Sequence, residues 1–192
     1  MIYRQADGFT TREEDSNKYI EGYFAVFNSP YIFDEDGDYE TIAPGAFDAS
    51  LANGDDIRAL INHDTTLVIG RTVSNTLELH TDEHGLFGRI AINTNDSEAV
   101  NIWERVRRGD VSQCSFGFEI LAEETITEPG NKVHFIIKDV RLHEVSVCTF
   151  PAYEATKVIA RSETDGHRAL EAWKIRTLAK LNGGAENGTE NT

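Results

Sequence analysis

The segment DVSQCSFGF, residues 110–118, places one serine between a cysteine and a Phe-Gly-Phe step, in a run that otherwise has the pattern of a buried strand. Strand alternation puts Phe116 and Phe118 on one face and Ser115 and Gly117 on the other. If the phenylalanines fill the core, the Ser115 hydroxyl faces outward beside a residue without a side chain, where a substrate carbonyl has room to approach. Ser115 is therefore either an ordinary strand serine or a nucleophile.

A serine hydroxyl is a poor nucleophile at its ordinary pKa, so it needs a nearby base that is itself oriented by a third group. The stretch INHDTTLVIGR places His63 after an apolar run, at the point where a strand opens onto a surface. Imidazole is the usual general base near neutral pH. His63 is therefore either that base or an ordinary loop histidine.

An acidic partner for such a base stands in LHEVSVCTFPAY. Val145 and Val147 share one strand face, which leaves Glu144 and Ser146 on the other, polar face. Among so many apolar neighbours the Glu144 carboxylate is only partly solvated and needs a partner, for which a histidine is suitable. His143 is adjacent, and on a regular strand the side chains of His143 and Glu144 point to opposite faces, so at most one of them enters a given site.

His63, Ser115 and Glu144 together form a possible catalytic triad. Their order along the chain differs from the orders in chymotrypsin, subtilisin and the α/β-hydrolases, and the sequence has no G-x-S-x-G elbow. If the triad exists, it stands on a different fold.

Two other segments invite a metal-binding interpretation. His80 and His84 flank two acidic residues in a turn, but no third ligand accompanies them. The acidic segment DEDGDYE, residues 34–40, has the alternating aspartates of a calcium loop, but its glycine comes two positions early and Gly45 stands where that loop requires glutamate. We therefore expect a solvated hairpin and a solvated loop, with no metal and no other cofactor.

The elements that must position these residues are mainly β. Alternating and β-branched runs predict strands at 18–28, 56–62, 66–71, 75–81 and 86–93, the last four as an antiparallel meander, and a long β stretch after residue 110 that is interrupted near 128–130. Helical periodicity predicts a short helix after Pro44, a helix over 95–109 and another over 167–181. The apolar side of the last helix is Leu170, Trp173, Leu178 and Leu181.

The composition of the 192-residue chain favours one domain with a tail. The 18 basic and 33 acidic residues give a formal net charge of −15, which repels nucleic acid and anionic membrane surfaces. We find neither an apolar run of membrane-spanning length nor a signal-peptide core. Two cysteines, Cys114 and Cys148, lie in apolar runs and behave as small hydrophobic residues. These features indicate a soluble protein made in a reducing cytoplasm.

Four segments taken together resemble the prohead maturation proteases of tailed bacteriophages, which are distant relatives of the herpesvirus assemblin proteases. In chain order they are GYFAVFNSP, INHDTTLVIGR, RRGDVSQCSFGF and LHEVSVCTFPAYEATKV. The resemblance runs from about residue 18 to about residue 160. It implies an α+β, mainly β fold with an antiparallel β-barrel-like sheet flanked by helices, and peptide-bond hydrolysis by a serine nucleophile.

The motifs of that family place the catalytic histidine at His63, the serine at Ser115 and the acid at Glu144. Assemblins use a second histidine as the third member, which keeps His143 as the alternative. For the oxyanion hole, the backbone amides near Thr149–Ala152 are candidates. The resemblance further implies a catalytic domain over 1–160, followed over 161–192 by a linker, an amphipathic helix and a disordered tail.

The family role implies the substrates and the place of action. We expect the protein to enter the procapsid in the host cytoplasm, and there to cut the scaffold protein or the scaffolding segment of the major capsid protein, and then itself. Self-association or docking on the scaffold is also expected. The alternatives are a non-catalytic capsid-assembly or scaffold-binding module of the same fold, and an esterase or amidase that uses the same triad on small molecules.

Overall fold

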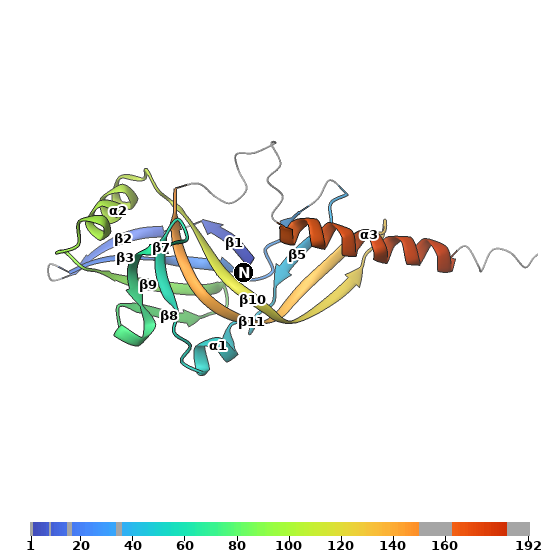
Figure 1. Ribbon diagram of the computed structural model, residues 1–192, viewed down its shortest axis with the longest axis horizontal. Helices are drawn as coiled ribbons and strands as arrows, with labels where there is room; N and C mark the ends of the chain where they lie inside the picture. The colour runs from blue at the N-terminus through green and yellow to red at the C-terminus, as the bar shows by residue number, and fades with distance from the viewer. Residues whose placement is uncertain (1, 8, 15–16, 34–35, 150–162, 184–192) are drawn as a thin grey trace, which may run out of the picture.

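Two β-sheets and three helices make up the computed structural model, which describes residues 2–7, 9–14, 17–33, 36–149 and 163–183 (Figure 1). The strands, in chain order, are β1 (Ile2–Asp7), β2 (Phe9–Glu14), β3 (Asn17–Val26), β4 (Tyr31–Ile32), β5 (Tyr39–Ile42), β6 (Arg58–Ile61), β7 (Asp64–Arg71), β8 (Leu77–Thr81), β9 (Gly85–Ile92), β10 (Gln113–Thr127) and β11 (Val133–Cys148). The helices are α1 (Asp48–Ala52), α2 (Ser97–Arg108) and α3 (Glu163–Gly183), with a short 3-10 turn, η1, at Thr72–Ser74.

The first sheet has the strand order β1-β10-β11-β5-β4, and the second has the order β2-β3-β9-β8. The long strand β11 organises the first sheet because it also pairs with β6, which in turn pairs with β7. The pairings of β11 with β5 and with β6 are parallel and lie at different parts of the strand, residues 134–137 and 144–147. The other strand pairings among the described residues are antiparallel.

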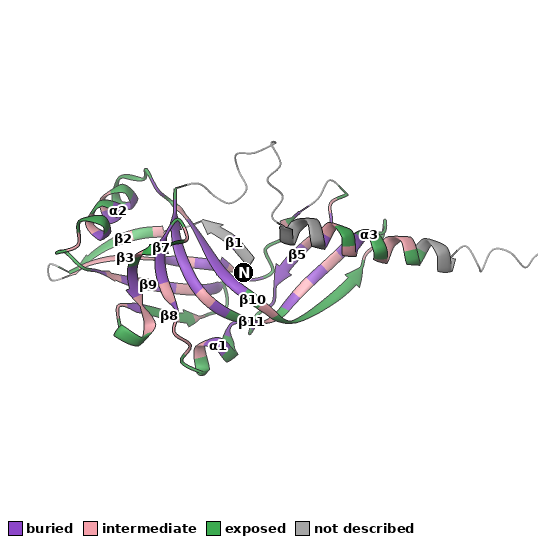
Figure 2. Ribbon diagram, in the orientation of Figure 1, coloured by how far each residue is buried: buried purple, intermediate pink, exposed green. Residues whose placement is uncertain are grey.

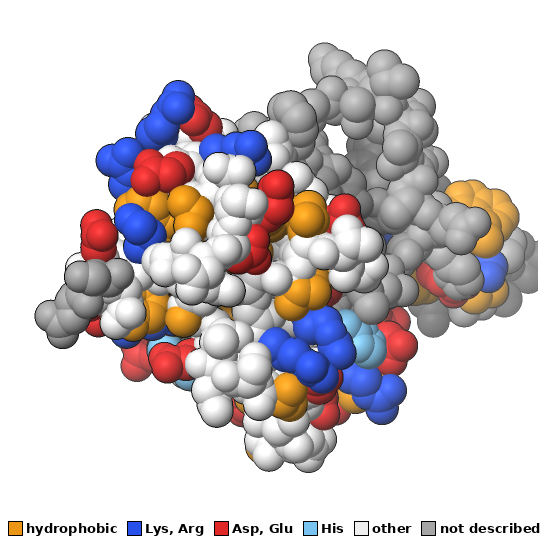
Figure 3. Space-filling model, turned by 60° about the vertical axis from the view of Figure 1, so that its left-hand side comes forward, with side chains coloured by type: hydrophobic (Ala, Val, Ile, Leu, Met, Phe, Trp, Pro, Cys, Tyr) orange, Lys and Arg blue, Asp and Glu red, His pale blue; other side chains and the backbone are white. Residues whose placement is uncertain are grey.

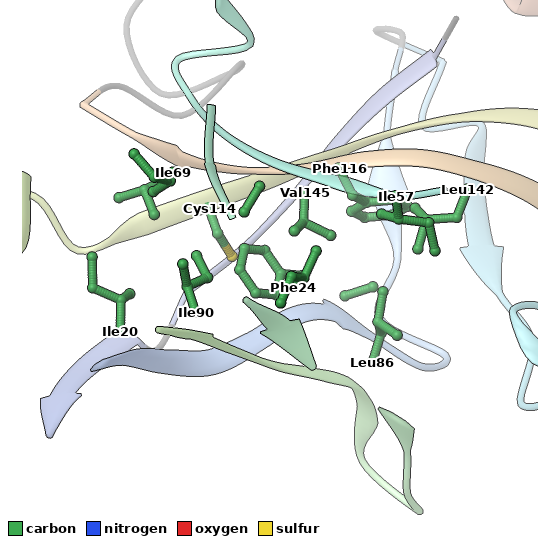
Figure 4. Packing of buried hydrophobic residues seen from close by; sticks show 14 of the residues in the cluster. Ile20, Phe24, Ile57, Ile69, Leu86, Ile90, Cys114, Phe116, Leu142 and Val145 are labelled. Carbon is green, nitrogen blue, oxygen red and sulfur yellow. The ribbon is translucent and has the colours of Figure 1, made fainter. Parts of the chain in front are cut away.

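The two sheets face each other across one hydrophobic core. Figure 4 shows Ile20, Phe24, Leu86 and Ile90 of the second sheet pointing toward side chains of the first sheet; the labelled partners there are Ile69, Cys114, Phe116, Leu142 and Val145. Burial is concentrated where β10 and β11 pass over the second sheet, while the distal half of β10 is exposed (Figure 2). The expected α+β, mainly β class is confirmed.

Helix α2 agrees closely with the predicted helix over 95–109. Its buried residues are those of the predicted apolar face, Ala99, Ile102, Trp103 and Val106. The Asp96 side chain accepts hydrogen bonds from the backbone N–H groups of Glu98 and Ala99, and Gly109 ends the helix with φ +82°. Local periodicity and capping residues were therefore sufficient to predict this element.

The predicted four-strand meander over 56–93 is wrong. Strands β6 and β7 form a hairpin in the first sheet, whereas β8 and β9 form a hairpin in the second. The chain crosses between the sheets at η1, where Asn75 adopts a left-handed conformation and Thr76 exchanges hydrogen bonds with Arg71. Alternation specifies which face of a strand is buried, but not which strand is its neighbour.

A β-bulge interrupts β11 at His143. Gly117 of β10 pairs with Glu144, but the next residue, Phe118, pairs with Leu142, so His143 is an extra residue in the ladder. The bulge changes the alternation, and both Leu142 and Val145 lie in the core although they are three residues apart. The expectation that His143 and Glu144 point to opposite faces assumed a regular strand, which the bulge removes.

The acidic segment over 34–40 is not a solvated loop in its described part. Asp38 and Glu40 are buried, and β5 begins at Tyr39. Arg4 and Arg168 form ion pairs with Glu40, and Arg176 forms one with Asp38. A buried carboxylate requires partners of this kind, and here two of the three arginines come from α3, far along the chain.

Helix α3 packs against the first sheet through a different face from the predicted one. Arg168 and Ala172 are buried, and Ala172 joins a small cluster with Phe33, Val133 and Phe135. The predicted apolar side does not pack in this way: the residues of that side with a described environment, Leu170, Trp173 and Leu178, are exposed. Leu181 lies beyond the described side chains. The packed face also carries the ion pairs of Arg168 and Arg176, which hydropathy does not register.

None of the helices in the described part of the chain combines the length and apolarity needed to cross a bilayer. On the face shown in Figure 3, acidic and basic side chains are interspersed, with small groups of hydrophobic side chains between them. The excess of acidic residues is therefore not gathered into one patch on that face.

Replacement of Glu40 by glutamine tests the buried ion pairs. We expect Glu40→Gln to lower the free energy of unfolding by about 3–5 kcal/mol, because it removes the buried anion that pairs with Arg4 and Arg168 and leaves Arg168 with its partly exposed partner Glu123. Urea denaturation followed by circular dichroism measures the loss. The control is Glu14→Gln, which removes an exposed partner of Arg89 and should leave the urea midpoint nearly unchanged. Equal midpoints for the two variants would contradict the prediction.

Candidate active site

The side chains of His63 and Glu144 are in direct contact, although 81 positions separate them in the sequence. Nδ1 of His63 lies 2.7 Å from Oε1 of Glu144, and the Glu144 side chain is only 6% exposed. A carboxylate can only accept hydrogen bonds, so Nδ1 carries a proton, and in the neutral imidazole Nε2 then presents its lone pair. This is the tautomer that a general base acting through Nε2 requires.

The turn between β6 and β7 holds His63 in place. Ile61 pairs with Asp64, which leaves Asn62 and His63 as a two-residue hairpin loop, and both have positive φ angles, +52° and +60°. Two successive positive φ angles are typical of a type I′ turn, and asparagine and histidine tolerate that conformation better than most residues. The Asn-His pair is the sequence signal that could have predicted this turn, although no turn was predicted from it.

Hydrogen bonds attach this turn to the end of β11. The backbone N–H of Asn62 donates to the carbonyl of Val147, and the Asn62 side-chain oxygen accepts from the backbone N–H of Thr149 at 2.8 Å. The Asn62 amide group also donates to Oγ1 of Thr149. The amide of Thr149 is thus already engaged, which argues against its expected role in an oxyanion hole. The other expected donors, residues 150–152, lie outside the described residues.

Ser115 lies on the same side of the sheet as this pair. It faces Ser146 across the β10–β11 ladder, and Gly117 faces Glu144 in the same way. Residues directly opposite in an antiparallel ladder have neighbouring side chains on one face. Ser115 is 1% exposed, and its hydroxyl has no hydrogen-bond partner among the described residues. Among the described residues a hydrogen bond therefore joins His63 to Glu144, and Ser115 lies on the same face of the neighbouring strand without a hydrogen bond to either of them.

Ser146 is a further polar residue of the site. Its hydroxyl donates to Oε2 of Glu144 at 2.5 Å and accepts from the backbone N–H of His63 at 3.2 Å. In the sequence Ser146 was only a neighbour of Glu144 on the polar face. No local pattern indicated that its hydroxyl joins the acid to the base.

The alternative third residue, His143, is directed elsewhere. Its Nε2 lies 3.5 Å from Oε1 of Glu119, an exposed carboxylate on β10. Glu144, and not His143, contacts the candidate base. The geometry thus favours Glu144 as the acid.

Groups of three or more metal-ligating side chains do not occur among the residues that the structure describes. The Tyr23 ring packs against His84, and the Tyr23 hydroxyl donates to Asp82, while His80 lies against Phe87. These side chains form part of the β8–β9 hairpin packing.

The components of a serine hydrolase site are a buried carboxylate, an imidazole that it holds in one tautomer, and a serine hydroxyl free to react; here the hydroxyl lies on the neighbouring strand, without a hydrogen-bond partner in the part of the chain that the structure describes. Comparison with known proteins shows the family to which the chain belongs. Residues 7–169 match the model of the caudovirus prohead serine proteases. The chain belongs to this family.

One relative is the prohead protease of Enterobacteria phage HK97, whose sequence is 35% identical to this chain over 159 residues. The match covers 80% of this chain and 66% of the length of the HK97 protein. Among solved structures, the bacteriophage T4 capsid assembly protease aligns with a TM-score of 0.46 and 9% identity, over 78% of this chain and 99% of the T4 chain.

Cys148 also lies in the candidate active site of this prohead protease, next to His63. Sγ of Cys148 lies 3.8 Å from Nε2 of His63, so a cysteine and a histidine are adjacent, as in a thiol protease. Burial, and secondarily the negative charge of Glu144, raise the pKa of Cys148 to about 12. A catalytic cysteine needs the opposite shift, because the thiolate is the nucleophile. Cys148 is therefore a buried thiol at neutral pH.

We expect native Cys148 to resist alkylation by iodoacetamide at pH 8, because a pKa of about 12 leaves a negligible thiolate fraction. Peptide mass spectrometry should find Cys148 unmodified in the native protein and modified after denaturation in urea. Cys148→Ala should in turn retain hydrolytic activity. Rapid alkylation of the native protein at Cys148 with loss of activity would identify Cys148, and not a serine, as the nucleophile.

Proposed function

We propose that this protein is a serine endopeptidase whose nucleophile is Ser115, whose general base is His63 and whose orienting acid is Glu144. The observation that carries the proposal is the hydrogen bond between the imidazole of His63 and the buried carboxylate of Glu144, on the sheet face that also presents Ser115. Membership of the prohead serine protease family supports the same chemistry.

In the proposed reaction Nε2 of His63 removes the Ser115 proton as the hydroxyl oxygen attacks the scissile carbonyl. The imidazolium that forms is stabilised by the Glu144 carboxylate, which accepts the hydrogen bond from Nδ1–H throughout the reaction and stays ionised. His63 then protonates the leaving amine, and water hydrolyses the acyl-enzyme by the reverse proton transfers. Because Ser115 is buried in this structure, substrate binding must open the site above it.

The proposed substrates are the scaffold protein or the scaffolding segment of the major capsid protein, and the protease itself, inside the procapsid in the host cytoplasm. The family description and the name of the HK97 relative support a substrate found in the prohead. Within the chain, we propose a catalytic domain over residues 1–160 and a linker, amphipathic helix and tail over 161–192. Crowding inside a shell would raise the effective concentration of the protease's own exposed segments and so favour cleavage of the latter region.

Removal of the nucleophile is the direct test. Ser115→Ala should fold normally and lower hydrolysis by about a millionfold, because only binding and oxyanion stabilisation remain. The protein is co-expressed with the capsid and scaffold proteins of the same phage, and intact mass spectrometry reads the cleavage of each and of the protease. Cys114→Ala is the control: Cys114 precedes Ser115 but lies in the core, so its loss affects stability and not the products.

Normal products from Ser115→Ala would refute the nucleophile assignment. Wild-type hydrolysis of a small ester without any cleavage of the capsid or scaffold protein would point instead to an esterase or amidase. A wild-type protein that cleaves nothing but binds the scaffold would indicate the non-catalytic module.

The identity of the acid can be tested by comparing two adjacent residues. Glu144→Gln should retain the fold and lower the rate by about 10⁴-fold, through loss of the charge that stabilises the imidazolium and of the correct tautomer. His143→Ala should change the rate little, because His143 contacts Glu119 and not His63. Initial rates of peptide hydrolysis at equal protein concentration measure both effects, and the reverse ranking would make His143 the third catalytic residue.

A further inference from the structure

We propose that Ser146 is a positioning residue that aligns the acid and the base of the active site through its single hydroxyl. The proposal rests on the proposed function for its kinetic consequence, but its structural content concerns only the contact between His63 and Glu144. Ser146 is fully buried on β11, two residues beyond Glu144 on the same strand face.

The first contact orients the carboxylate. Oε2 of Glu144 accepts the Ser146 hydroxyl proton at 2.5 Å, and Oε1 accepts the Nδ1 proton of His63 at 2.7 Å. With each oxygen engaged in a different direction, rotation of the carboxylate about its last side-chain bond would break both hydrogen bonds. Hydrogen bonds to a charged acceptor are the stronger class, and this one is shielded from water.

The second contact holds the backbone of the base. The same Ser146 oxygen accepts the backbone N–H of His63 at 3.2 Å. His63 has a φ of +60°, a conformation that is uncommon for residues other than glycine, although histidine tolerates it better than most, and the hydrogen bond to Ser146 helps to hold it. Ser146 is thus connected to both ends of the histidine, to its backbone directly and to its imidazole through Glu144.

Ser146 does not itself take the place of the nucleophile. Its hydroxyl proton is directed to Glu144, and the contact it makes with His63 is to the backbone and not to the ring. Ser115, directly opposite on β10, is the hydroxyl without a hydrogen-bond partner among the described residues. On this face Ser115 is therefore the proposed nucleophile, and Ser146 positions the acid and the base.

The chain contains a matched control for Ser146. Ser50 on α1 is also buried, and its hydroxyl donates to a carboxylate, Asp55, at 2.6 Å and accepts a backbone N–H, that of Leu142, at 2.9 Å. The hydrogen bonds of Ser50 reach neither His63 nor Glu144. Replacing each serine by alanine thus removes the same kinds of hydrogen bond, once inside the candidate site at Ser146 and once outside it at Ser50.

The experiment compares Ser146→Ala, Ser146→Thr and Ser50→Ala in the full chain. General-base catalysis contributes about 10²–10⁴-fold, and misalignment forfeits part of it, so Ser146→Ala should lower kcat by about 10- to 100-fold with KM changed less than about twofold. Ser146→Thr restores the hydroxyl on a residue suited to a strand and should recover most of kcat. Ser50→Ala should lower the melting temperature without lowering kcat.

A second measurement does not depend on turnover. The Nδ1 proton of His63, held by Glu144, should give a far-downfield proton NMR resonance in the wild type and in Ser50→Ala, and this resonance should be lost or broadened in Ser146→Ala. An unchanged resonance in Ser146→Ala, or equal kcat values for Ser146→Ala and Ser50→Ala, would overturn the positioning role. If the wild type cleaves nothing but the resonance responds as expected, the proposed function fails and the positioning role stands.

Discussion

The burial of one carboxylate is the constraint on which the site depends. Glu144 is almost fully removed from water, and an ionised carboxylate in that position requires a hydrogen-bond partner for each oxygen. The partners are the imidazole of His63 and the hydroxyl of Ser146. Burial thus gives the acid a fixed direction, and through it the base has a fixed tautomer.

The sheet supplies those partners by an unusual pairing. Strand β6 runs parallel to the C-terminal part of β11, so its end delivers the β6–β7 turn beside Glu144 and Ser146. The opposite edge of β11 pairs with β10, which brings Ser115 level with Ser146. The base and the nucleophile therefore approach the acid from the two strands that flank it.

The bulge at His143 allows β11 to contribute both Leu142 to the core and Glu144 to the candidate site. Along β11, Leu142 faces the core before the bulge, and Val145 and Val147 face it afterwards. If His143 occupied a regular place in the ladder, Glu144 would share the face of Leu142 and its charge would lie among apolar side chains. Because His143 is instead accommodated as a bulge, the carboxylate lies on the side of the sheet where His63 and Ser115 are found. Bulges are frequent next to active sites for this reason.

Much of this protein could be predicted from local patterns in its sequence. The strand character of the segments around Ser115 and Glu144, the separation of Ser115 from Phe116 and Phe118 and of Glu144 from Val145 and Val147, and the buried face of α2 all follow from periodicities of two and 3.6 residues, which act within one element. The expected exposure of the Ser115 hydroxyl is wrong, because Ser115 is buried in the folded protein. The residue types suited to a base, a nucleophile and an acid were also visible in the sequence.

Contacts between distant segments set the rest. The parallel pairing of β6 with β11, the bulge in the β10–β11 ladder, the place of Cys148 beside His63 and the hydrogen bond from the His63 backbone to Ser146 all depend on residues that local periodicity cannot relate. The same holds at the other end of the sheet, where Glu40 looks solvated in the sequence but is buried by arginines from both ends of the chain. The physical reason is that alternation specifies which face of a strand is buried, whereas strand neighbours and the partners of buried charges are chosen by the free energy of the whole packed structure.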